Sequence, residues 1–199
     1  MPSTEPTTRD RILECAEELF GRRGYDAASI ADIAQACGVS TGLIYYHYTD
    51  KESLLRALVE RAGTLFGPPT RTALEGEGSP TERLAAFIEA RVRVTLEHHN
   101  LVRILMRPMT DPEGALAGEV LAGISQSIQA IASVIAEGIE TGEFEPVDPY
   151  LAAESLFALL HTRVVAGALA APHSELVASE PADLAAFITG LFLQGITRC

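Results

Sequence analysis

The sequence of 199 residues has no tryptophan, only three cysteines, and a single lysine among its fifteen basic residues. The cysteines, Cys15, Cys37 and Cys199, are widely separated and odd in number, and they form no CxxC or Cys/His pattern. A disulfide framework and a zinc site are therefore not expected. Because Cys15 and Cys37 fall on apolar helical stripes, the sequence predicts that both are small residues of the core.

The sequence does not indicate a membrane-spanning or a secreted protein. The longest uncharged stretch, residues 120–136, contains three serines and two glutamines, whereas a membrane span needs roughly 18 predominantly apolar residues. The N-terminus lacks the basic and apolar regions of a signal peptide. We therefore expect a cytoplasmic protein with no membrane partner. No segment alternates with period two for long enough to predict a strand, so the expected fold class is all-α.

Motifs of common enzyme classes are scarce. The sequence has no HExxH motif, no P-loop and no glycine-rich dinucleotide fingerprint. His98 and His99 are candidate metal ligands, but adjacent residues on a helix point about 100° apart and make a poor chelate. We therefore predict no enzymatic activity, no cofactor and no metal site.

Helical periodicity extends over the whole chain, and glycine and proline divide it into about nine helices. Gly67-Pro68-Pro69 predicts a boundary between a domain at 1–66 and a domain at 67–199. Seven basic and ten acidic side chains give the first domain a net charge of −3, and the second has −9, so no broad basic field marks a nucleic-acid partner. The first helix is expected to begin after Thr7 and end at Gly21-Arg-Arg-Gly24, and later ones to cover residues 29–37, 42–48, 50–66, 81–99, 101–107, 113–140, 148–171 and 181–197.

Residues 29–51, SIADIAQACGVSTGLIYYHYTDK, have the features of a helix-turn-helix. Ala34 supplies the small side chain where the two helices cross, and Gly38 allows the tight turn four residues later. The second helix carries three tyrosines and a histidine, whose polar tips are hard to satisfy in a core. The alternative is an ordinary helical hairpin with tyrosines packed at its edge. We predict DNA contacts by Ser29, Thr41, Gly42, Leu43, Tyr45, Tyr46, His47 and Lys51.

Two placements within this segment stay open. Lys51 lies in the first turn of the helix at 50–66, where the helix dipole disfavours a cation. A basic residue there indicates a phosphate contact, and the alternative is an ordinary exposed lysine. Tyr45 and Tyr48 are each as compatible with a half-buried position against the first helix as with the DNA surface.

The same segment resembles a known family. Gly24-Tyr25, Ser29-Ile-Ala-Asp-Ile-Ala34, Gly38-Val-Ser40, Ile44-Tyr-Tyr-His-Tyr48 and Lys51-Glu-Ser-Leu-Leu55 are similar, in order and spacing, to the N-terminal DNA-binding domain of TetR-type transcriptional regulators. The resemblance covers about residues 8–60, and residues 67–199 match only in helix number and length. It implies a homodimer that binds a palindromic operator, represses or more rarely activates promoters, and releases DNA when a small molecule binds the C-terminal domain.

The C-terminal half offers two further expectations. The helices at 148–171 and 181–197 are apolar on more than one side, which predicts a four-helix interface between two copies of the chain. Polar groups among apolar neighbours favour a small-molecule pocket. The alternative for two of them is that Arg91 lies on the surface and His161 bonds a core carbonyl. The predicted effector-binding residues are Phe87, Arg91, Met106, Phe157 and His161.

The helix at 50–66 is the expected lever between the two functions, because Lys51 lies in its first turn while Leu65 and Phe66 reach the effector domain. A ligand that favours a wider separation of the recognition helices would then lower DNA affinity. The rival interpretation from another class is a helical adaptor that binds protein only, for which the apolar helices at 148–197 would also be suited.

Overall fold

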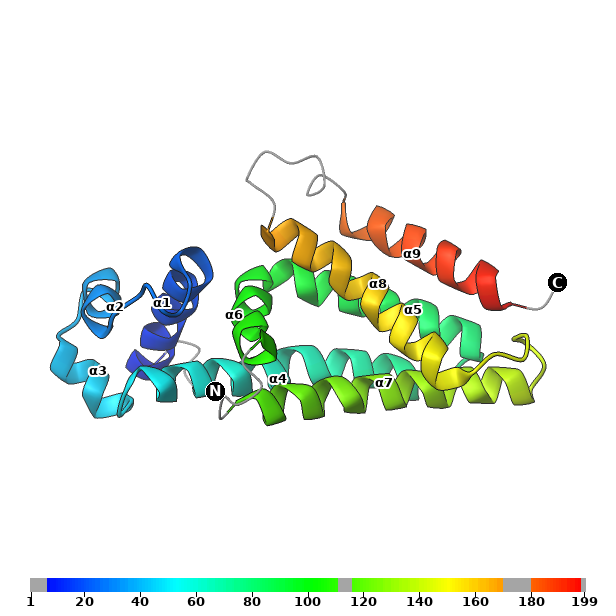
Figure 1. Cartoon of the computed structure of the whole chain (residues 1–199), viewed down its shortest axis with the longest axis horizontal. Helices are drawn as coiled ribbons and strands as arrows, with labels where there is room; N and C mark the ends of the chain where they lie inside the picture. The colour runs from blue at the N-terminus through cyan, green and yellow to red at the C-terminus, as the bar shows by residue number, and fades with distance from the viewer. Residues whose placement is uncertain (1–6, 111–115, 170–179, 198–199) are drawn as a thin grey trace, which may run out of the picture. The chain divides into compact units, whose positions relative to one another are not determined.

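The computed structural model describes residues 7–110, 116–169 and 180–197 (Figure 1). Among these residues it confirms the all-α fold class, with a single isolated β-bridge between Phe144 and Thr197. The helices are α1 (Thr8–Arg23), α2 (Ile30–Cys37), α3 (Thr41–His47), α4 (Lys51–Glu75), α5 (Pro80–Glu97), α6 (His99–Thr110), α7 (Ala117–Glu140), α8 (Pro149–Leu169) and α9 (Pro181–Ile196).

The helices group into two compact units. Unit 1 comprises residues 1–62 and 100–120, and unit 2 comprises residues 63–99 and 121–199. Helix α4 therefore begins in unit 1 and ends in unit 2, and most of α6 belongs to unit 1. The domain boundary near residue 66 stays a prediction.

Side-chain caps set the ends of the first three helices. The Thr7 hydroxyl accepts a hydrogen bond from the Asp10 amide, and the Asp10 carboxylate accepts one from the Thr7 amide. Ser29 and Asp32 form the same box at the start of α2. Gly38 ends α2 with a φ of 68° and a ψ of 33°, a left-handed conformation that glycine adopts without strain.

Two helices continue through prolines that were expected to end them. Helix α4 extends through Pro68 and Pro69 to Glu75, and not to residue 66, and α6 extends through Pro108 to Thr110, and not to residue 107. Prolines remove two backbone donors from α4. Burial of one face in unit 2, at Phe66, Thr70 and Leu74, favours continuing the helix.

The remaining helix ends differ from expectation by a few residues. Helix α5 ends at Glu97 and α6 starts at His99, so the break lies one or two residues earlier than predicted. Residues 113–115 of the predicted helix at 113–140, and residues 170–171 of the one at 148–171, lie outside the described residues.

The prediction that Cys15 and Cys37 are unlinked core residues is wrong. Both are half-buried, and a disulfide joins them across the contact between α1 and α2. Their Cα atoms lie 5.8 Å apart, within the range that a disulfide requires. The separation of 22 residues contains no spacing signal for this pair, because the packing of the two helices brings them together.

The core of unit 2 is formed by apolar side chains of α5, α7, α8 and α9. Helix α7 is the single described helix that is long and apolar enough to cross a membrane by length and composition. Its Ile131 and Ile135 are fully buried in this core, and core helices of soluble proteins pass the same test. Helices α5, α8 and α9 lie side by side (Figure 1).

We expect the disulfide to stabilise unit 1. Closing a loop of 22 residues restricts the unfolded chain by an amount worth about 3 kcal/mol. Thermal unfolding of oxidised protein should therefore lie several degrees above that of protein reduced with dithiothreitol, and Cys15→Ser should abolish the difference. Cys199→Ser is the control and should keep it. Identical unfolding with and without reductant would contradict this expectation.

Candidate DNA-binding and effector sites

Helices α2 and α3 form the predicted helix-turn-helix. The small residue Ala34 and the neighbouring Ile33 are buried, and Ile44 of α3 is fully buried, so one face of each helix is in the core of unit 1. The Val39 amide donates to the Ala34 carbonyl at 3.0 Å, which closes the turn after α2. Ser40 caps α3 by accepting from the Leu43 amide at 3.2 Å. The outward face of α3 is thereby fixed.

That outward face presents aromatic side chains to solvent. Tyr46 is 82% exposed and Tyr45 is 55% exposed, although large aromatic residues usually lie in contact with protein. The Tyr46 and His47 rings meet edge to face at 5.1 Å. Of the other predicted DNA contacts, Ser29, Thr41 and Gly42 are exposed, and Leu43, His47 and Lys51 are half-buried.

The structure separates the two tyrosines whose placement was open. Tyr45 faces solvent, whereas Tyr48 is buried and its hydroxyl donates to the Arg9 carbonyl at 3.3 Å. Burial raises the pKa of Tyr48, and the Arg9 guanidinium over its ring partly offsets that effect. Tyr48 therefore joins α3 to α1. Ser29 uses its hydroxyl within the capping box with Asp32, whose pKa this hydrogen bonding lowers.

Lys51 lies in a cluster that the sequence did not reveal. Its ammonium is 4.2 Å from the ring centroid of Tyr25 and makes a long hydrogen bond of 3.5 Å to the Asp26 carbonyl. Arg107 of α6 lies 4.4 Å from the same ring and pairs with the Asp26 carboxylate at 3.4 Å. Tyr25 also packs edge to face on Phe20 at 5.1 Å. We call Tyr25, Asp26, Lys51 and Arg107 the Tyr25 cluster.

The Tyr25 cluster has a clear electrostatic basis. The dipole at the start of α4 disfavours the Lys51 charge, and the electron-rich face of an aromatic ring offsets this by about 0.5–2 kcal/mol. Burial is the main cause that raises the pKa of Tyr25, and Arg107 acts in the opposite direction. The sequence singled out the Gly24-Tyr25 pair as part of a motif. Arg107 lies 82 positions after Tyr25, and no motif in the sequence connects the two residues.

A further contact attaches the start of α6 to α1. A Cβ atom added at Gly21 would lie within 2.8 Å of three Asn100 side-chain atoms, so only glycine permits this approach. In the same unit, Arg56 of α4 pairs with Glu119 of α7 at 2.6 Å. Unit 1 thus contains the helix-turn-helix together with most of α6 and the first turn of α7.

In unit 2, three of the predicted effector residues come together. The Arg91 guanidinium lies 5.5 Å from the ring centroid of Phe157 and 5.4 Å from that of Phe66. His161 stacks on Phe157 at 4.2 Å. Phe87 is fully buried in the same core as Phe157, whereas Met106 belongs to unit 1. The sequence placed Phe66 at the effector end of its helix but did not include it among the effector-binding residues, because the helix was expected to end there.

Arg91 and His161 are in surroundings that disfavour charge. Burial lowers the pKa of Arg91 to about 10, so it stays positively charged at neutral pH. Burial, followed by the positive charge of Arg91, lowers the pKa of His161 to about 4, and a hydrogen bond with the Phe157 carbonyl acts against this. His161 is therefore neutral at pH 7. Of the two alternatives, a surface position for Arg91 is not met, because it is half-buried, and a bond of His161 to a core carbonyl stays an alternative.

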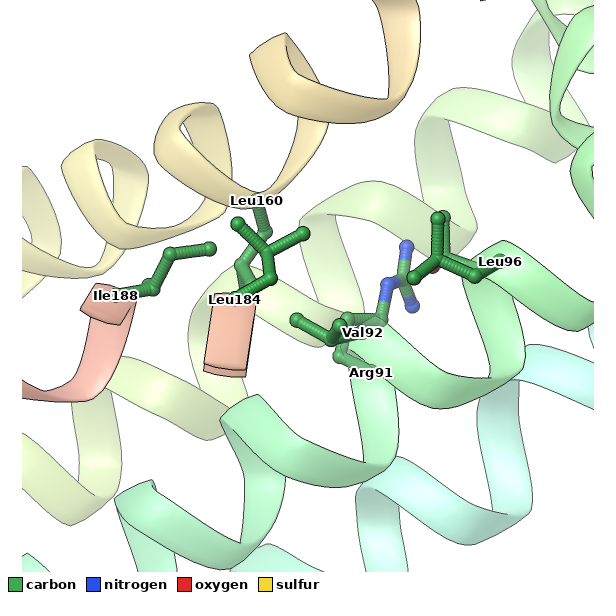
Figure 2. Close-up of a pocket in the computed structure, with 7 residues that line it drawn as sticks. Arg91, Val92, Leu96, Leu160, Leu184 and Ile188 are labelled. Carbon is green, nitrogen blue, oxygen red and sulfur yellow. The ribbon is translucent and has the colours of Figure 1, made fainter. Parts of the chain in front are cut away.

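A hollow lies beside Arg91. It is small, partly open to solvent, and lined by residues of α5, α8 and α9. Figure 2 shows the Arg91 guanidinium beside Leu96, with aliphatic side chains from the facing helices. The lining residues are Arg91, Val92, Thr95, Leu96, Leu160, Leu184 and Ile188.

Two family models match the chain. The model for bacterial regulatory proteins of the tetR family matches residues 12–58, and the model for a tetracyclin repressor-like C-terminal domain matches residues 77–164. The first covers most of α1, all of α2 and α3 and the first turns of α4, and the second covers α5 through most of α8. The chain belongs to the TetR family of bacterial transcriptional regulators.

Individual TetR-family proteins are similar over most of the chain. The fatty acid metabolism regulator protein of Bacillus subtilis (strain 168) is 22% identical over 182 residues, covering 91% of this chain and 94% of the relative. The crystal structure of the TetR family regulator PfmR from Thermus thermophilus has a TM-score of 0.80 and 29% identity, covering 95% and 100%. AibR in complex with isovaleryl coenzyme A and operator DNA has a TM-score of 0.76 and 21% identity, covering 92% and 96%.

This TetR-family protein is a ligand-responsive repressor that binds operator DNA as a dimer.

One short motif matches an enzyme pattern. Gly38-x-Ser40-x-Gly42 has the GxSxG spacing of hydrolase nucleophiles, a motif in which a strand precedes the serine. Here α2 precedes Ser40, whose hydroxyl caps α3. Within the described residues, no group of three or more His, Cys, Asp or Glu side chains could hold a metal ion.

Proposed function

We propose that this TetR-family repressor acts in the cytoplasm without enzymatic activity, and that residues 1–66 contact the operator through α3 and the ends of its neighbouring helices. The observation that carries this proposal is the exposure of Tyr45 and Tyr46 on a helix whose opposite face is buried through Ile44. An outward tyrosine can pack on a sugar or thymine methyl group while its hydroxyl bonds a phosphate or base edge. The proposed contacts are Ser29, Thr41, Gly42, Leu43, Tyr45, Tyr46, His47 and Lys51.

Within this set, Thr41 and Tyr46 are the proposed base-reading residues and Lys51 the phosphate contact. Thr41 is exposed in the first turn of α3, the part of a recognition helix that approaches base edges. Among the described residues, the Lys51 ammonium contacts a ring face and makes one long hydrogen bond, and a phosphate oxygen would be a stronger partner.

The proposed effector site includes Phe87, Arg91, Phe157 and His161 in the domain at 67–199. Helix α4 connects this site with DNA, because its Phe66 lies against Arg91 while Lys51 is in its first turn. A ligand that displaces the Arg91 guanidinium from Phe66 would act on the same helix that positions Lys51. The complex of AibR with isovaleryl coenzyme A and operator DNA supports the proposal that one protein of this fold binds both kinds of ligand. Met106 stays a predicted effector contact.

Lys51→Ala should weaken operator binding about equally for all sequences. Loss of a phosphate contact carries no base information, and it should reduce the salt dependence of binding by about one unit per protomer. Fluorescence anisotropy with a palindrome from the promoter region of the gene, titrated at several salt concentrations, measures both effects. Arg71→Ala removes a charge from an exposed position of the same helix and should change neither.

The same assay tests the proposed function as a whole. Tyr46→Ala should change the preference for particular operator bases, since its side chain is placed to reach them. Wild-type protein that binds the palindrome no better than a scrambled duplex would support the adaptor interpretation. A changed base preference in Lys51→Ala would show that its assignment to phosphate is wrong.

We propose that α8 and α9 form the dimer interface, as expected for residues 148–171 and 181–197. Leu151 and Leu159 lie two turns apart on α8 and are 61% and 38% exposed, and Phe187 and Leu191 lie one turn apart on α9 and are 66% and 53% exposed. These spacings place each pair on one face of its helix. A second copy of the chain would cover both faces across a two-fold axis.

Phe187→Glu combined with Leu191→Glu should therefore dissociate the dimer. Each apolar side chain buried at the interface contributes about 1.5–3 kcal/mol, so we expect the dissociation constant to rise at least about 100-fold. Sedimentation velocity at micromolar concentration would show the variant near 21.3 kDa and the wild type at twice that mass. Leu121→Glu, at another exposed leucine, is the control and should stay dimeric. A variant dimer as stable as the wild type would rule out this interface.

A further inference from the structure

Arg91 differs from the other inward arginine of α5. Arg83, two turns earlier on the same helix, forms an ion pair with Glu137 of α7. Arg91 has no hydrogen-bond or ion-pair partner within the described part of the chain, and its neighbours are the rings of Phe66 and Phe157. The chain has 27 acidic residues against 15 basic ones, so a shortage of carboxylates does not explain the difference.

Aromatic rings satisfy only part of what a guanidinium requires. A ring face attracts the positive charge, but a guanidinium also has five N–H donors in a fork that matches the two oxygens of a carboxylate. A buried cation with unused donors is costly unless an anion or acceptor completes it. Arg91 is among the residues that line this solvent-open hollow, so a ligand that enters it can reach the guanidinium.

We propose that the effector of this repressor is an aliphatic carboxylic acid, bound with its carboxylate on Arg91 and its hydrocarbon chain among Leu96, Leu160 and Leu184. This inference rests on the effector site of the proposed function and adds the chemical class of the ligand. The aliphatic lining of the hollow matches a hydrocarbon chain.

The charge of the site favours a monoanion. Arg91 is the one cation among the residues that line the hollow, and the neighbouring His161 is neutral at pH 7, since burial and Arg91 lower its pKa to about 4. A carboxylate balances a single guanidinium. A phosphate monoester, with close to two negative charges at neutral pH, would leave excess charge in an apolar hollow.

Isothermal titration calorimetry with matched probes tests this inference without DNA. The probes are alkanoates of four to eight carbons, their primary amides, which have the same shape without the charge, and hexyl phosphate. Wild-type protein should bind the best alkanoate at least tenfold more tightly than its amide, and hexyl phosphate more weakly than hexanoate. Equal binding of acid and amide, or tighter binding of hexyl phosphate, would overturn the inference.

Variants at Arg91 separate charge from shape. Arg91→Met should remove the preference for acid over amide while the amide binds as before, and Arg91→Lys should retain part of it. Arg93→Met, at an exposed arginine of the same helix, is the control and should keep the full preference. Circular dichroism and thermal unfolding check that each variant is folded. If Arg91→Met fails to fold, the result with Arg91→Lys decides, because unchanged discrimination there would overturn the inference.

The outcome also distinguishes this inference from the proposed function. Operator binding is measured on the same preparation by anisotropy. If the protein binds its palindrome and binds neither alkanoates nor amides, the carboxylate assignment is wrong and the DNA-binding function stands. If alkanoates bind with the expected preference while the palindrome is not recognised, the carboxylate assignment stands and the proposed operator contacts are wrong.

Discussion

The ring of Tyr25 interacts with cations from two different helices, and this contact joins the start of α4 to α6. Lys51 begins α4 and Arg107 belongs to α6, and their charged groups lie 4.2 and 4.4 Å from the same ring centroid. Two cations near one ring repel each other, and Asp26 offsets this repulsion with its carboxylate on Arg107 and its carbonyl on Lys51. A displacement of α6 therefore changes the environment of the lysine proposed to contact phosphate.

In the proposed function, α4 would be a second connection between the effector site and the operator. Phe66 lies against Arg91, and Lys51 lies four turns earlier on the same helix. A carboxylate that draws the guanidinium away from Phe66 would remove a contact that favours one position of α4. Ligand and operator then compete through differences in affinity for two arrangements of the protein, worth about 1–3 kcal/mol in typical regulators.

Local signals explain why much of the fold followed from the sequence. The helix starts after Thr7 and at residue 29 and the turn at Gly38 depend on neighbours within a few residues, and the structure has all three where they were expected. The end of α4 predicted at residue 66 from Pro68 and Pro69 was wrong, because burial of the next turns of the helix outweighs the loss of two backbone donors. Cys15 pairs with Cys37, and Tyr25 with Arg107, because of how the helices pack. Such packing produces no sequence motif of fixed spacing, so neither contact could be predicted. The hydrophobic stripe of α5 predicted Arg91 at an inward position, but its lack of a carboxylate partner is visible only in three dimensions.

A double-mutant cycle on operator binding tests the Tyr25 cluster most directly. Operator affinities of wild type, Lys51→Ala, Arg107→Met and the double variant would be measured by fluorescence anisotropy, with Arg103→Met as the exposed control on α6. If Tyr25 couples the two cations, the Arg107→Met effect should change by at least about 0.5 kcal/mol once Lys51 is absent, whereas Arg103→Met should combine additively. Effects of Lys51→Ala and Arg107→Met that add within about 0.3 kcal/mol would contradict the coupling.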